Sequence, residues 1–477
     1  MFSNLLNGIN DICGISSNDK VNKEVEPFTF DANDVYKYPT LFEEADEMLQ
    51  VSLLIYTFTD LRFLAKKAKD GTLKGGEFKD PDLILSLPLN LSTCVGLIEE
   101  NVDVIKQEVG DADHEMTIKA LESIQKRYNN NSPMMKAPLQ WFKSDPSLPY
   151  LVAYGDDNPD KELVYAVGVD PVRKRVTVAF RGSVTPSDFL TDATISLERQ
   201  PNPVKDLSVD QSDKIGIHKG FFNYLLKPRK EYGGESKCAE IFQHVIKLFE
   251  DEDRKKNYKL YVTGHSLGGA LSTLFGFYAA SSARMEGTIP LPISVVSVAS
   301  PRVGDAAFQE AFYHLEHQGC LRHLRVANKG DPVTIMPESS GIKVFALMSP
   351  ITYAALKFSD SKFEEKETYR HTGIKLLLSK KDQAEGDGTE QQQQENGDIQ
   401  QYRISYSCKK YIKEEVNSKK KTTGFNILKS FSKKDIPEVV NHFGDTYYNN
   451  LTSVKDSLSE VTLNDLYLSH ASSVFSK

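Results

Sequence analysis

The chain has 477 residues, of which 40% are hydrophobic and 26% are charged, and its formal net charge at pH 7 is -8. This is the composition of a globular protein that is long enough for one large domain with extensions or for two domains. Because the chain is acidic overall, its net charge does not favour nucleic acid as a partner, and we expect none.

Cysteine usage and hydropathy favour a reduced compartment and a chain without a membrane span. The five cysteines are scattered, with neither a CxxC pair nor a metal-ligand spacing, so we expect no metal site. The N-terminus lacks a basic segment followed by an apolar core, which argues against a secretory signal, although sequons at Asn90, Asn130 and Asn450 point the other way. Residues 260–283 carry no charged group besides His265, but glycines and hydroxyl residues interrupt them, so no transmembrane segment is predicted. We therefore expect a cytoplasmic protein, peripheral at most to membranes or lipid droplets.

The N-terminal region is predicted to be helical. Residues 1–35 have no clear period and resemble a loosely attached arm, whereas apolar residues recur at helical spacing over 41–64, and the helix should end by Gly71. Further helical patterns cover 91–109 and 115–128. We interpret residues 1–140 as an arm and a helical extension that flanks a core.

Strands and helices then alternate. The expected strands are 163–169, 175–180, 258–262, 293–299 and 321–327, and the expected helices are 239–249, 270–282 and one that opens near Pro301. This order predicts an α/β fold with a mostly parallel central sheet flanked by helices, within residues 141–379.

The C-terminal part departs from this order. Residues 380–435 begin with a stretch rich in Gln, Glu and Gly that we expect to be disordered. From Lys409 to Lys434 there are nine lysines and two glutamates with interleaved apolar residues, so this run is either a solvated insertion or a basic segment that contacts an anionic membrane. Residues 436–477 regain apolar character and are expected to rejoin the core.

The segment Gly264-His-Ser-Leu-Gly268 carries the chemistry. A Gly-x-Ser-x-Gly pattern between a strand and a helix is typical of a nucleophile elbow, a sharp turn that presents a serine hydroxyl. By chance alone the pattern occurs on the order of 0.1 times in a chain this long, so its context decides. Ser266 is the candidate nucleophile.

A serine nucleophile needs a histidine base and an acid that orients the histidine. In the chain order expected for this elbow the acid follows a later strand, and Asp331 does so directly after 321–327. The histidines downstream are His371, His442 and His470, and the residues alone do not choose among them.

An oxyanion hole is expected from two backbone amides. One belongs to Leu267, directly after the nucleophile, and the other to Ser183, which follows strand 175–180 and a glycine that permits close approach.

Together these segments resemble the class 3 lipases, the fungal triacylglycerol lipase-like branch of the α/β-hydrolases. The resemblance rests on motifs in family order: Val178-Ala-Phe-Arg-Gly-Ser183 with Asp188-Phe-Leu-Thr-Asp192, His218-Lys-Gly-Phe221, Thr263-Gly-His-Ser-Leu-Gly-Gly-Ala270, Ala299-Ser-Pro-Arg-Val-Gly304 and Asp331-Pro-Val333. It implies that Ser266 is the nucleophile, Asp331 the acid, and Ser183 with Leu267 the oxyanion hole. Family members commonly carry a Tyr-x-His-x-Gly segment whose histidine is structural, which resembles the segment around His371 and favours His442 as the base.

The resemblance implies a serine hydrolase that cleaves the carboxylic esters of acyl lipids without a cofactor. The substrate is a triacyl-, diacyl- or monoacylglycerol or a phospholipid. The connector from Thr185 to Gly216 takes the place of the family's lid but is polar, so we expect weak interfacial activation. Two alternatives remain, a catalytically silent lipase-like scaffold and an esterase for short soluble esters.

Overall fold

The computed structural model describes residues 38–74, 76–109, 149–156, 162–183, 196–204, 213–337, 369–379, 402–406, 439–442 and 444–467. The predicted helix at 115–128, the run from Lys409 to Lys434, and His470 lie outside these residues, as does most of the polar connector after Ser183.

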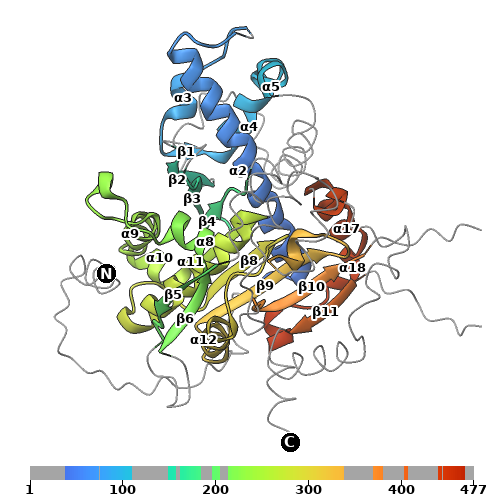
Figure 1. Ribbon diagram of the computed structural model, residues 1–477. Coiled ribbons are helices and arrows are strands. Elements are labelled where there is room, and N and C mark those ends of the chain that lie inside the picture. The colour runs from blue at the N-terminus through green and yellow to red at the C-terminus, as the bar shows by residue number, and fades with distance from the viewer. Residues whose placement is uncertain are drawn as a thin grey trace, which may run out of the picture.

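The described strands form a nine-stranded sheet in the order β1-β2-β3-β4-β7-β8-β9-β10-β11 (Figure 1). The strands are β1 (Leu89–Asn90), β2 (Tyr150–Gly155), β3 (Tyr165–Asp170), β4 (Arg175–Phe180), β7 (Lys259–His265), β8 (Ile293–Val298), β9 (Leu321–Asn328), β10 (Ile374–Leu378) and β11 (Tyr402–Tyr406). A separate two-stranded ribbon pairs β5 (Leu197–Pro201) with β6 (Lys214–His218).

The sheet is mixed, with a parallel centre as expected and antiparallel pairs at both sides. Strands β4, β7, β8, β9 and β10 are parallel neighbours, but β1, β2 and β3 on one side and β11 on the other pair in antiparallel fashion. The short turn between β3 and β4 explains part of this, since a parallel pair needs a long crossover. The parallel centre with crossover helices is the α/β-hydrolase arrangement expected from the sequence.

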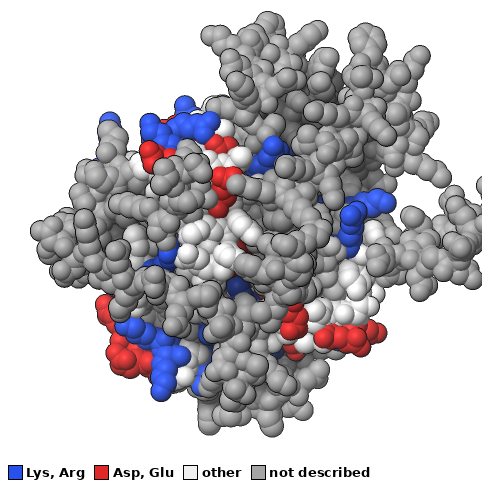
Figure 2. Space-filling view, turned by 90° about the horizontal axis from the view of Figure 1, so that it is seen from below, with Lys and Arg blue, Asp and Glu red and all other residues white. Residues whose placement is uncertain are grey.

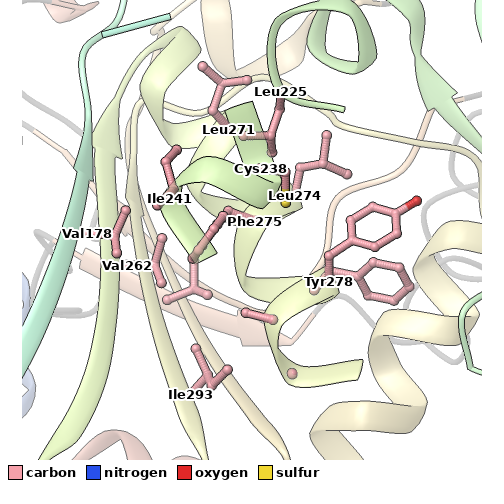
Figure 3. Packing of buried hydrophobic residues seen from close by; sticks show 14 of the residues in the cluster. Val178, Leu225, Cys238, Ile241, Val262, Leu271, Leu274, Phe275, Tyr278 and Ile293 are labelled. Carbon is pink, nitrogen blue, oxygen red and sulfur yellow. The ribbon is translucent and has the colours of Figure 1, made fainter. Parts of the chain in front are cut away.

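One face of the sheet is covered by α8 (Lys219–Leu225), α9 (Lys237–Phe249), α11 (Leu267–Glu286) and α12 (Ala306–His317). Figure 3 shows Val178, Val262 and Ile293 of the strands facing the helical residues Leu274 and Phe275. Because α11 follows the elbow directly, this packing fixes the start of α11 against the end of β7.

The other face is covered by α2 (Leu41–Lys69), which lies across β4, β7 and β8. The helix was expected to flank the core, yet most of its length is buried, because α3 (Pro81–Leu85), α5 (Val102–Val109) and α17 (Gly444–Ser453) pack on its remaining sides. The helical region before residue 140 thus shares its core with strands from the predicted hydrolase part of the chain. The remaining described helices are α4 (Leu91–Glu100), α10 (Glu252–Asn257), α18 (Lys455–Leu458) and the short 3-10 turns η3 (Lys230–Tyr232), η4 (Val333–Ile335) and η7 (Val439–His442).

By length and composition α2 would also qualify as a membrane span, but 78% of its most apolar 18-residue window is buried inside this fold. It is accounted for as a core helix. The segment 260–283 is divided between β7 and α11.

Candidate active site

The turn between β7 and α11 holds Ser266 in a strained backbone conformation. Its φ is 58° and its ψ is -124°, a region that residues with a side chain rarely adopt. A Cβ on Gly264 would lie 2.3 Å from the backbone of Gly268, and a Cβ on Gly268 would lie 2.2 Å from the carbonyl oxygen of Phe180. Only glycine therefore fits at either position, and the tight turn lifts the serine above the end of the sheet.

The structure brings Ser266, His442 and Asp331 together from three separate segments. Ser266 Oγ lies 2.9 Å from His442 Nε2, and His442 Nδ1 lies 3.1 Å from each oxygen of the Asp331 carboxylate. Since an ionised carboxylate only accepts hydrogen bonds, Nδ1 carries the proton and Nε2 is free to accept the one from serine. All three residues are buried.

The structure places His442 within reach even though a long insertion separates it from Asp331 in the sequence. It lies in η7, at the start of the C-terminal segment, and the segment is anchored next to it: Asn328 Nδ2 donates to the carbonyl of Asn441 at 3.0 Å. Asn328 is the last residue of β9, just before Asp331. The C-terminal end of β9 thus positions Asp331 and also anchors the segment that carries His442.

Tyr447 is a site residue that the sequence analysis missed. Its hydroxyl donates to Asp331 Oδ2 at 2.6 Å and accepts from the backbone N-H of Asn328 at 3.0 Å. Burial, together with the charge of Asp331, raises its pKa well above the ordinary value, so the phenol stays a donor. The aromatic pair after His442 was visible in the sequence, but only the fold of α17 shows that its first member turns toward the acid.

Asp331 has a further partner, since its Oδ1 accepts from the backbone N-H of Val333 at 2.9 Å. The Asp-Pro turn therefore contributes an amide of its own to hold the carboxylate.

His265 is hydrogen-bonded to the backbone of the catalytic candidate His442. Its Nε2 lies 2.9 Å from the carbonyl oxygen of His442, so Nε2 must donate, and Nδ1 accepts from the hydroxyl of Tyr56 in α2 at 3.4 Å. Burial, followed by the neighbouring His442, lowers the pKa of His265 to about 3, so the ring is neutral. This neutral donor restrains the backbone of His442.

His371 occupies a different place. Its Nε2 lies 2.6 Å from the carbonyl oxygen of Thr334 and therefore donates, while Gln309 donates to its backbone oxygen. Burial lowers its pKa well below the ordinary value. His371 Nε2 is therefore hydrogen-bonded to a backbone carbonyl, whereas His442 Nε2 is hydrogen-bonded to Ser266.

The two residues expected as oxyanion donors are Leu267, which follows Ser266 directly, and Ser183, which follows Gly182. Leu267 is the first residue of α11, where backbone N-H groups lack intrahelical partners and the helix dipole favours negative charge. Ser183 follows Gly182, and a Cβ on Gly182 would lie 2.6 Å from the carbonyl oxygen of His265 and 3.2 Å from Ser266 Cβ. The missing side chain at Gly182 thus lets the Ser183 segment approach the nucleophile.

The part of the chain that the structure describes holds no candidate metal site that would compete with the site around Ser266. There, no group of three or more His, Cys, Asp or Glu residues is arranged to hold a metal ion. Cys94, Cys238 and Cys320 are buried free thiols. Figure 2 shows described basic and acidic residues interspersed on one face.

Comparison with known proteins assigns the segment around this site. Residues 177–340 match the lipase (class 3) family. This part of the chain belongs to the class 3 lipases. The matched segment holds Ser183, Ser266, Leu267 and Asp331, whereas His442 and Tyr447 lie beyond it.

Curated relatives of this class 3 lipase segment are plant proteins. Phospholipase A1-IIgamma of Arabidopsis thaliana is 29% identical over 173 residues, which are 35% of this chain and 39% of that protein. Phospholipase A1-II 3 of Oryza sativa subsp. japonica is 32% identical over 177 residues, 35% of this chain and 40% of the relative. The match thus spans about two fifths of the length of either relative.

Solved structures of fungal lipases are also similar. The triacylglyceride lipase of Rhizomucor miehei is 20% identical with a TM-score of 0.33, over 48% of this chain and 66% of that chain. A lipase from Rhizopus microsporus var. chinensis is 18% identical with a TM-score of 0.34, over 62% of this chain and 72% of that chain.

Proposed function

We propose that this protein is a serine hydrolase that cleaves carboxylic ester bonds of acyl lipids through an acyl-enzyme intermediate. The observation that supports it most directly is the hydrogen-bonded series from Ser266 to His442 to Asp331 at the elbow. A scaffold protein would have no need for a strained serine, a histidine nitrogen 2.9 Å from its hydroxyl and an acid held by Tyr447.

The mechanism follows from these contacts. His442 Nε2 takes the proton as Ser266 Oγ attacks the acyl carbonyl, and the charge of Asp331 stabilises the imidazolium. Amides of Leu267 and Ser183 stabilise the oxyanion, an effect worth roughly 3 to 4 kcal/mol per donor in comparable enzymes. The imidazolium then protonates the leaving alcohol, and the same histidine activates a water that releases the fatty acid.

The substrate that we favour is a phospholipid acyl ester. The plant relatives carry the name phospholipase A1, and the sequence of the connector after Ser183 is polar rather than amphipathic. We also propose that the enzyme acts in the cytoplasm, peripherally on anionic membranes, with contact through the lysines from Lys409 to Lys434.

The test measures fatty acid release from phosphatidylcholine vesicles, from the same vesicles with an anionic lipid added, and from emulsified triolein. We expect phosphatidylcholine to be cleaved faster than triolein, and the anionic vesicles faster still. Ser266→Ala and His442→Ala should each lower kcat by several orders of magnitude.

His371→Ala is the matched control for the base, because this histidine is half-buried and its ring donates to the carbonyl oxygen of Thr334 instead of contacting Ser266. Equal activity of Ser266→Ala and the parent would refute hydrolysis by this site. A larger loss from His371→Ala than from His442→Ala would refute the assignment of the base, and a steep rise of the rate on triolein above its solubility limit would refute the substrate preference.

A further inference from the structure

A cavity of about 130 Å³ lies on the α2 face of the sheet, away from the face covered by α11. Interiors are normally packed without such voids, and the sequence explains this one. Where β3 and β4 pass beneath α2 they present small side chains or none, namely Ala166, Gly168, Thr177 and Ala179. The space that larger strand residues would fill is left open.

The walls of the cavity are hydrocarbon. They consist of Val51, Leu54, Ile55 and Phe58 of α2, Cys94 and Ile98 of α4, and Leu151 and Tyr154 of β2. The hydroxyl of Tyr154 is hydrogen-bonded to Thr59, so Tyr154 contributes its aromatic ring to the cavity wall. An apolar cavity favours apolar ligands over water.

Charge is confined to one end of the cavity and is already compensated there. Arg175 Nη1 lies 2.6 Å from Glu47 Oε2, and Arg175 Nη2 lies 3.8 Å from Asp170 Oδ2. Asp170 and Arg175 are paired at the end of the β3–β4 hairpin. The lining of β4 runs from Arg175 to Ala179, a distance of about 13 Å at the rise of a strand. The cavity is therefore elongated, apolar along its length and polar at one end.

We propose that this cavity binds one unbranched acyl chain, with its polar head at the end marked by Arg175 and Asp170. The choice of ligand rests on the proposed function, because a lipid esterase meets single acyl chains both in fatty acid products and in lysophospholipids. The shape excludes a folded polar ligand. Because Arg175 is already paired with Glu47 and Asp170, the hydrocarbon chain rather than the charge of the head accounts for binding.

Two elements connect the cavity with the active site. Ile55 lines the cavity, and its neighbour Tyr56 donates to His265 Nδ1, which is the ring that restrains His442. Ala179 lines it as well, and β4 leads through Gly182 to Ser183. An acyl chain that shifts α2 or β4 would thus change the position of the base or of an oxyanion donor, and its occupancy should alter turnover.

Binding is measured by calorimetry with dodecanoate, below its micelle-forming concentration, on the full chain carrying Ser266→Ala so that no turnover occurs. We expect one binding event that is weakened about tenfold or more when Thr177→Leu fills the cavity. Ala239→Leu in α9, on the opposite face of the sheet, is the matched control and should leave this event unchanged. Dodecanoyl lysophosphatidylcholine in a second series tells whether the free acid or the lipid is preferred.

Gly168→Ala is the milder second variant, since its added Cβ would lie at ordinary contact distances of 3.4 and 3.6 Å from Tyr150 and Leu151. Thermal unfolding verifies that both variants fold. Unchanged dodecanoate and lysolipid affinity in both variants, or no binding by the parent, overturns the proposal. Because binding is read on an inactive protein, a failure of the proposed hydrolysis is seen separately, as a Ser266-containing enzyme that binds dodecanoate but releases no fatty acid.

Coupling is measured on the active enzyme with p-nitrophenyl acetate as a short soluble ester. Dodecanoate should change kcat of the parent but leave kcat of Thr177→Leu unaltered, whereas simple competition at Ser266 would raise KM in both. An identical response of the two proteins overturns the connection through α2.

Discussion

At the scale of single residues, the site depends on hydrogen bonds that fix protonation states. Asp331 accepts from His442, Tyr447 and the amide of Val333, so its carboxylate is held in one orientation. His265 is neutral and donates to the backbone of His442. These contacts leave His442 Nε2 as the acceptor that faces Ser266.

Replacing Tyr447 by phenylalanine removes one donor to the acid and keeps the ring. A hydrogen bond to a charged group is worth about 1.5 to 3 kcal/mol. Because Asp331 acts on the imidazolium that forms during the reaction, we expect kcat to fall at least about tenfold while KM stays the same. Steady-state kinetics of Tyr447→Phe on a soluble ester checks this.

Tyr448→Phe, one residue further along α17, is the control and should keep the parent kcat. A rise in KM with unchanged kcat in Tyr447→Phe would mean that the phenol acts on substrate binding instead.

At the scale of elements, α2 shows why local pattern was insufficient. Periodicity correctly predicted a helix from Leu41, but it could not show that Glu44, Glu47 and Arg62 would be buried. Those charges are satisfied by partners far away in the chain, such as Asp156 for Arg62 at 2.8 Å and Arg175 for Glu47 at 2.6 Å. Helix α2, which was predicted to flank the core, is therefore buried within it.

The ion pair between Glu44 and Arg322 tests this role of α2. Arg322 also donates to Asn464 at 2.6 Å and to Ser294 at 3.1 Å, so one guanidinium joins α2, β8, β9 and the C-terminal segment. Arg322→Met leaves Glu44 buried without its cation, and we expect the free energy of unfolding to drop by about 3 to 5 kcal/mol. Urea denaturation gives this value.

Glu44→Gln added to Arg322→Met removes the orphaned charge and should recover part of the loss. Arg254→Met, which breaks the more exposed Arg254–Asp251 pair, should cost about 1 kcal/mol or less. If the double variant were less stable than Arg322→Met alone, the buried charge of Glu44 could not be the cause.

At the scale of the whole molecule, the sequence predicted the parts that depend on short-range patterns. The elbow and the strands β3, β4, β7, β8 and β9 follow from motifs and alternation whose spacing is local, and so do the positions of Ser266 and Asp331 at strand ends. The added strands β2 and β11 were not predicted, because their pairing depends on which edges remain free once the centre has formed. Among the histidines, His442 could be favoured only by resemblance, since its position is determined by a C-terminal segment that returns to β9 after a long insertion.

The same return of the chain buries Glu316 of α12. Its side-chain oxygens accept from Tyr406 of β11 at 3.0 Å and from Tyr467 at 2.5 Å, so two segments distant in sequence close over it. Burial raises the pKa of Glu316 from 4.5 to about 8. The carboxyl is thus protonated in the fold at neutral pH and ionised in the unfolded chain.

The sign of the effect follows from this difference. The contribution of Glu316 to stability is fully present below pH 4.5 and is lost as the pH rises through about 8. Between these values the free energy of unfolding should decline by up to about 1.4 kcal/mol per pH unit on account of this group. The buried neutral histidines act in the opposite direction, so their effect must be removed by comparison with a variant.

Glu316→Gln keeps the size of the side chain and cannot ionise. We expect the parent to lose stability relative to Glu316→Gln as the pH is raised from 5 to 8, measured by urea unfolding at each pH. Glu99→Gln, at an exposed position of α4, should run parallel to the parent throughout. If the stability of Glu316→Gln had the same pH dependence as that of the parent, the carboxyl would be ionised in the folded protein. Tyr406 and Tyr467 would then donate their hydrogen bonds to a buried anion.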